Sequence, residues 1–66
     1  MEAQDFIREL LAKGMTQAEI EARTGIKQGT VSKVYRGEIK DVLSRNYRAL
    51  QALHTEMCPP EPAAAT

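Results

Sequence analysis

A short polar stretch from Lys27 to Lys33 carries side chains suited to recognising a hydrogen-bonding ligand. The side-chain amide of Gln28 both donates and accepts, which matches the N6 and N7 edge of adenine. A lysine ammonium donates to guanine, and a threonine methyl packs against the methyl group of thymine. We therefore take four residues as candidates for contact with base edges: Lys27, Gln28, Thr30 and Lys33.

Basic and hydroxyl side chains around this stretch are candidates for binding a phosphate backbone. Guanidinium and ammonium groups pair with phosphate oxygens, and hydroxyl groups donate to them. Arg36 and Lys40 are the first candidates, followed by Thr16, Ser32 and Arg45. An exposed polar helix surface that binds no ligand is the alternative interpretation of these residues.

The charge of the chain is unevenly distributed. The 66 residues carry no net charge, but residues 1–22 have a net charge of −3, residues 23–48 of +5 and the remainder of −2. Overall neutrality argues against nucleic-acid binding, for which a basic domain is expected. A basic region on one side of the molecule is nevertheless what a DNA contact needs, and ordinary scatter of surface charges is the alternative.

Other kinds of site find little support. His54 lies near the end of an expected helix with no second ligand recognised at metal-binding spacing, so we expect a surface or dipole-capping histidine and no metal site. Cys58 is the single cysteine, which excludes an internal disulfide and leaves one between two chains open. No acid, base and nucleophile converge at a recognisable spacing, so we expect neither enzyme activity nor a cofactor or small-molecule ligand.

A short helix and a tight turn must precede the candidate base contacts. Thr16 and Glu19 have the spacing of a capping box, which predicts a helix from Gln17. Met15, just before the cap, and Ile20, four residues after it, have the spacing of a hydrophobic staple. Gly25 ends the helix, because glycine adopts the left-handed conformation that closes a helix without a Cβ penalty.

A second short helix must carry the candidate base contacts themselves. Val31, Val34 and Tyr35 repeat at helical spacing and predict its buried side. Gly37 supplies the stop signal. The two helices and their turn, residues 16–36, match the helix-turn-helix pattern, whose second helix can lie in the DNA major groove.

Further helices are expected on both sides of this pair. One apolar stripe predicts a core helix from about Ala3 to Lys13. Another helix, capped by Asp41 or Ser44, should extend to about Glu56 with a broad apolar side. Part of that side should close the core over the first helix. Its far end is predicted to contact a second subunit through Leu50, Leu53 and Met57.

These elements make one domain. Residues 1–57 are expected to form a compact all-α domain of four helices. Residues 58–66 contain three prolines and are expected to be a disordered tail. A chain this short buries a small core, which favours self-association. No apolar run is long enough to span a bilayer and we recognise no signal peptide, so a cytoplasmic protein is expected.

The segment TQAEIEARTGIKQGTVSKVYRG, residues 16–37, resembles the helix-turn-helix of the phage repressor and Cro-like family. The resemblance rests on its Thr-Gln opening, on Gly25 followed by an apolar residue, and on the valine spacing. It covers about a third of the chain closely. Glu21 departs from the family pattern, which usually has alanine or another small residue there. The resemblance implies a lambda-repressor-like fold, a base-reading role for Gln28 and a phosphate contact for Gln17.

The resemblance also implies a function. We expect a sequence-specific repressor that binds double-stranded operator DNA in a bacterial host cell. It would act as a homodimer on a palindromic operator, through the major groove. The alternative is a protein-binding or antitoxin-like module, in which the helix-turn-helix is a scaffold and the apolar side of the last helix binds another protein.

Overall fold

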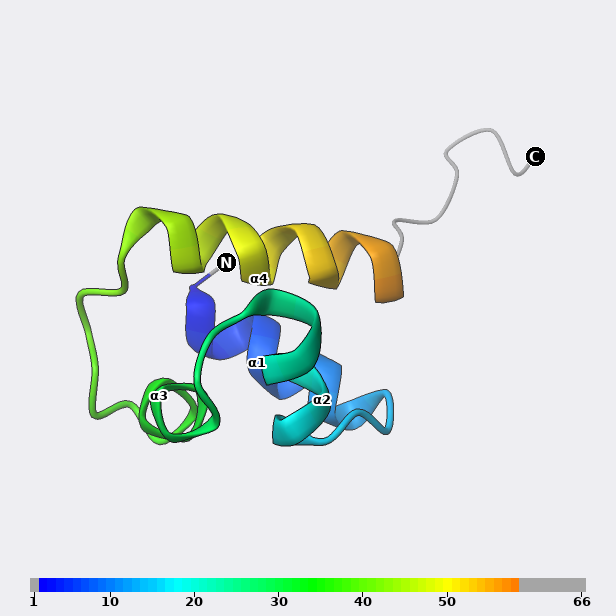
Figure 1. Ribbon diagram of the computed structural model, residues 1–66, viewed down its shortest axis with the longest axis horizontal. Helices are drawn as coiled ribbons and strands as arrows, with labels where there is room; N and C mark the ends of the chain where they lie inside the picture. Colours follow the sequence, from blue (N-terminus) through cyan, green and yellow to red (C-terminus); the bar gives the residue numbers. More distant parts are fainter. Residues whose placement is uncertain (1, 59–66) are drawn as a thin grey trace.

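The computed structural model describes residues 2–58, which form four helices and no strand. They are α1 (Ala3–Ala12), α2 (Gln17–Thr24), α3 (Gln28–Tyr35) and α4 (Ser44–Met57). α1 packs against α4 and α3, and α2 packs against α3 and α4. In Figure 1, α4 runs across the view along one side of the molecule, whereas α3 is seen nearly end on at the opposite side. The predicted all-α, four-helix fold is confirmed.

The core lies between α1 and the other helices. Of the predicted stripe of α1, Ala3, Phe6, Ile7 and Leu10 are buried, and Leu11 is partly buried. The rest of the core comes from the other helices and from all three connections between helices. Met15, Ile20, Ile26, Val31, Val34, Leu50 and Leu53 are buried, and Ile39, Val42, Tyr47 and Met57 are partly buried against them. No buried residue of the described chain is polar or charged. Apolar burial therefore holds the helices together.

The local signals for α2 are confirmed. The Glu19 N–H donates to Thr16 Oγ1 over 3.1 Å, and the Thr16 N–H donates to Glu19 Oε1 over 3.1 Å. These two bonds form the predicted capping box. Gly25 closes the helix with a left-handed φ of 80°.

The start of α4 differs from the prediction. Leu43 occupies the N-cap position and no side chain caps the helix, so neither Asp41 nor Ser44 has that role. Leu43 is 59% exposed because it precedes the first helical turn and does not share the buried side of α4. The prediction that Tyr35 lies on the buried side of α3 is wrong. Tyr35, the last residue of the helix, is exposed, and only Val31 and Val34 are buried.

The predicted subunit contact on α4 also needs correction. Leu50 is 1% exposed and Leu53 is 4% exposed within a single chain. A domain this small needs both leucines to cover α1, so they cannot present a surface to a second subunit. Met57 is half-buried and packs against the edge of the core.

Two further expectations concern membrane-spanning helices and the C-terminal tail. Within residues 2–58, no helix combines the length and the apolar character needed to cross a bilayer. The predicted disordered tail, apart from Cys58, lies outside the described residues.

Candidate nucleic-acid interface

The turn between α2 and α3 is held by polar contacts as well as by apolar burial. The Gly25 N–H donates to the carbonyl of Glu21 over 2.8 Å. Thr24 Oγ1 donates to the Ile20 carbonyl over 2.6 Å and accepts from the Ile26 N–H over 3.2 Å. Ile26 itself is buried. The side chain of Thr24 thus ties the end of α2 to the turn, a role that the sequence analysis missed.

Glu21 holds the N-terminal end of α3. Lys27 occupies the N-cap position of α3 and makes no capping bond with its side chain. Instead, Glu21 Oε1 accepts from the Gln28 N–H over 3.1 Å. A carboxylate at a helix N-terminus satisfies an unpaired donor and interacts favourably with the helix dipole. The residue that departs from the family pattern therefore links α2 to the start of α3, which alanine could not do.

The C-terminal end of α3 is fixed by its own backbone and by α1. Gly37 has a φ of 79°. Its N–H donates to the Val34 carbonyl over 3.0 Å, and the Glu38 N–H donates to the Lys33 carbonyl over 2.9 Å. This pair of bonds is the Schellman motif.

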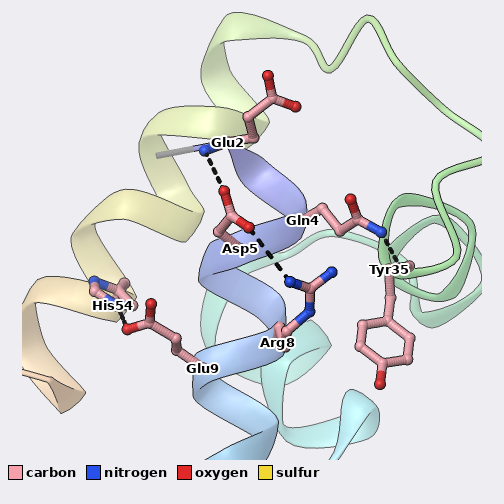
Figure 2. A network of polar contacts seen from close by, with 7 residues as sticks. All are labelled: Glu2, Gln4, Asp5, Arg8, Glu9, Tyr35 and His54. Carbon is pink, nitrogen blue, oxygen red and sulfur yellow. Dashed lines mark hydrogen bonds and ion pairs between the residues drawn. The ribbon is translucent and has the colours of Figure 1, made fainter.

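Gln4 adds a contact from α1 to the same end of α3. Its Nε2 donates to the Tyr35 carbonyl over 2.8 Å, and Figure 2 shows the amide reaching from α1 to this residue. No pattern in the sequence indicates this contact, because 31 positions separate the two residues. Neighbouring helices therefore hold α3 at both of its ends.

The two sides of α3 differ in exposure. Val31 and Val34 are buried in the core. On the other side, three predicted base contacts, Lys27, Gln28 and Lys33, are exposed. Thr30 is half-buried at the edge of this surface. We call the exposed side of α3, formed by Lys27, Gln28, Gly29 and Lys33, the outer face.

Gly29 lies on the outer face without an internal reason to be glycine. A Cβ added there would meet no atom within 4 Å. Its φ is not positive, so a residue with a side chain can adopt the same backbone conformation. Glycine in a helix is destabilising relative to alanine by roughly 0.5–1 kcal/mol. No contact of Gly29 within the described residues offsets that cost.

The predicted phosphate contacts come from several elements. Thr16 and Gln17 lie at the start of α2, Ser32 is half-buried on α3, and Lys40 is exposed in the connection to α4. Arg45, in the first turn of α4, lines a shallow hollow together with Thr24 and Gly25. The fold therefore brings Arg45 beside the turn of the helix-turn-helix.

The basic side chains differ in whether they are paired. Arg36 Nε lies 2.5 Å from Glu38 Oε2, and both side chains are more than half exposed. Exposed pairs of this kind contribute little stability, so a phosphate can compete with Glu38 for the guanidinium. Four predicted DNA contacts make no ion pair within residues 2–58: Lys27, Lys33, Lys40 and Arg45.

The chain is similar in sequence to a known protein family and to a phage protein. Residues 7–42, more than half of the chain, match a family model described as Helix-turn-helix. A protein P2 from Acyrthosiphon pisum secondary endosymbiont phage 1 is 43% identical over 53 residues. The match covers 80% of this chain and 56% of the phage protein, so the chain spans about half the length of this curated relative. No solved structure matches the chain significantly.

Proposed function

The chain belongs to the phage repressor and Cro-like family of helix-turn-helix DNA-binding regulators, and we propose from this that it is a sequence-specific repressor that reads duplex DNA with α3. The observation that carries the proposal is the outer face of α3. Neighbouring helices hold this helix at both ends, yet its outer face contacts no other helix through a side-chain hydrogen bond or ion pair within residues 2–58. A rigidly held helix with a free polar side suits insertion into a major groove.

In this proposal, the exposed side chains of α3 read the bases. Gln28, at the N-terminal end of the helix, forms a two-bond contact with adenine, and Lys27 and Lys33 donate to guanine. Thr30 contacts bases from the edge of the outer face. Gly29 allows the backbone of α3 to approach the DNA closely, which explains a glycine that the free chain does not need.

Phosphate contacts orient the domain on the duplex. Gln17 and Thr16 bind at the N-terminus of α2, where unpaired backbone N–H groups favour an anion. Ser32, Arg36, Lys40 and Arg45 complete the set of predicted phosphate contacts. Such contacts fix the register of the protein on DNA without reading its sequence.

The proposal includes a homodimer on a palindromic operator. Two copies would place their recognition helices in major-groove segments about 34 Å apart. Binding near a promoter would then exclude polymerase, in the cytoplasm or nucleoid of a bacterial host. Leu50 and Leu53 are buried and do not form the subunit contact, so Met57 remains from the predicted set, and Leu43 offers further exposed apolar surface.

The alternative of a protein-binding or antitoxin-like module depends on an exposed apolar side of α4. The burial of Leu50 and Leu53 removes most of that surface. The outer face of α3 is polar and basic, which favours DNA over an apolar protein partner.

Selection from a random pool of duplex DNA tests the proposal. The retained DNA is sequenced after binding at two salt concentrations. We expect enrichment of a palindrome whose half-sites are one helical turn apart, at both salt concentrations. Weak binding without sequence preference, lost on adding salt, would contradict sequence reading and leave the basic residues with a purely electrostatic role.

A further inference from the structure

Three side chains with different metal-binding atoms meet between α1 and the end of α4. They are the carboxylate of Glu9, the imidazole of His54 and the thiol of Cys58. One ligand atom from each lies within 4.8 Å of both others. None of the three residues belongs to α2, α3 or the predicted DNA contacts. This cluster contradicts the expectation from the sequence that His54 has no second metal ligand nearby.

His54 is held in place and is not a surface histidine. Its side chain is only 13% exposed, and its Nε2 lies 2.8 Å from Glu9 Oε1. The imidazole also packs on the ring of Phe6, with 5.0 Å between the ring centroids. Figure 2 shows Glu9 on α1 and His54 on α4 pointing toward one another. Packing therefore directs a ring nitrogen at the carboxylate before any ion binds.

Cys58 lies one helical turn after His54. Its N–H donates to the His54 carbonyl over 2.7 Å, which continues the helical geometry to the cap of α4. Residues four apart in a helix lie on the same side. The half-buried thiol is thus placed beside the imidazole. The His-x-x-x-Cys spacing was the sequence signal for this pair, whereas the contribution of Glu9 depends on how α1 and α4 pack.

We propose that Glu9, His54 and Cys58 bind one divalent transition-metal ion of the zinc type. Imidazole nitrogen and thiolate sulfur favour zinc over magnesium or calcium, which prefer oxygen ligands. Bond lengths of about 2.0–2.3 Å place tetrahedral ligand atoms roughly 3.3–3.7 Å apart, so the three side chains need to move by about 1 Å or less. Water supplies the fourth ligand. The thiol releases its proton to solvent as the sulfur–metal bond forms. The ion replaces the hydrogen bond between His54 Nε2 and Glu9 Oε1, and the imidazole proton moves to Nδ1.

Metal binding would join the end of α4 to α1. A chain of this size has a small core, and a bound metal contributes its binding free energy to the folded state when the unfolded chain lacks the site. The bound ion would therefore stabilise the packing of α4 against α1. The site is separate from the outer face of α3. It does not depend on the proposed DNA-binding function.

Zinc and cobalt titrations of the reduced full chain test the site in the absence of DNA. With free zinc at about 100 times its Kd, we expect the Tm to rise by on the order of 10 °C. Cobalt should produce the near-ultraviolet charge-transfer absorption of a sulfur–cobalt bond. Native mass spectrometry should find one zinc ion per chain.

Single substitutions assign the ligands. Cys58→Ser should abolish the charge-transfer absorption and most of the rise in Tm, and His54→Gln should also remove most of the rise. Thr55→Ser is the matched control, because Thr55 is exposed on the same turn of α4 and is not a ligand. This control should respond to zinc as the unmodified chain does.

Three results would overturn the proposal. The first is no rise in Tm in excess zinc for the unmodified chain. The second is an equal rise for the unmodified chain and for Cys58→Ser, which would place the ion elsewhere. The third is one zinc ion for every two chains, which would show a site shared between chains.

Discussion

The helices α3 and α4 are built alike on their buried sides and differ on their exposed sides. α3 buries Val31 and Val34, and α4 buries Leu50 and Leu53. Each helix is therefore anchored by one apolar stripe against the rest of the domain. The burial of these stripes stabilises the fold in both cases.

Polar residues on α4 contact neighbouring helices, whereas the outer face of α3 does not. Glu56 pairs with Arg23 of α2, and His54 lies against Glu9 of α1. By contrast, the side chains of Gln28 and Lys33 make no hydrogen bond or ion pair within residues 2–58. This difference indicates that α4 stabilises the fold through contacts on several of its sides, whereas the outer face of α3 remains available for a ligand.

The largest expected effect comes from the buried stripe of α4. Leu50→Ala should lower the free energy of unfolding by about 2–5 kcal/mol, because it removes buried methyl groups and leaves a cavity. That loss is a large fraction of the roughly 5–15 kcal/mol typical of small domains. Urea unfolding without DNA measures it. A loss well below 1 kcal/mol would show that α4 does not close the core as described.

The next prediction compares exposed glutamines on α3 and α4. Gln28→Ala should weaken binding to the selected operator by about 1–3 kcal/mol and leave nonspecific binding unchanged. Stability should change little, since the Gln28 side chain is exposed. Gln51→Ala, at an exposed glutamine of α4, is the matched control and should affect neither property. Equal losses on operator and nonspecific DNA would remove the base-reading role of Gln28.

A smaller effect tests the close approach of the α3 backbone to DNA. Gly29→Ala should raise the free energy of unfolding by roughly 0.5–1 kcal/mol, because the added methyl group meets no neighbour and alanine favours the helix. The same substitution should weaken operator binding. This variant is thus expected to be more stable than the unmodified chain and to bind the operator more weakly. Unchanged operator affinity would show that the outer face does not require glycine.

The smallest effect concerns two arginines that both form exposed ion pairs. Arg36→Ala should weaken binding to all duplexes alike and make the slope of log affinity against log salt less steep by about 0.9. Arg23→Ala, which breaks the pair with Glu56 of α4, should leave that slope unchanged. Binding isotherms at several salt concentrations compare the two variants. If their slopes were the same, Arg36 would have no special phosphate contact.

Local signals in the sequence predicted much of the fold. The capping box at Thr16, the glycine at position 25 and the apolar stripe of α1 each involve residues within a few positions of one another, and each is confirmed. The valine spacing likewise predicted the buried side of α3. Such patterns act within one element and are readable without knowledge of how elements pack.

Contacts between distant residues could not be predicted in this way. The bond from Gln4 to Tyr35 and the contact of His54 with Glu9 exist only because of how α1 packs against α3 and α4. The prediction made from the broad apolar side of α4 failed for the same reason. Its periodicity does not distinguish residues that cover the chain's own core from residues that meet a second chain, so Leu50 was assigned to the wrong surface.

The most direct test of the account is a nuclear magnetic resonance titration of the nitrogen-labelled chain with the selected operator duplex. We predict that the largest shifts occur at the amides of Gln28, Gly29 and Lys33, with smaller ones at Gln17. The amides from Gln51 to Met57 should move little, because that half of α4 serves the fold. The largest shifts in that half of α4, with an unchanged α3, would contradict the claim that α3 reads the DNA.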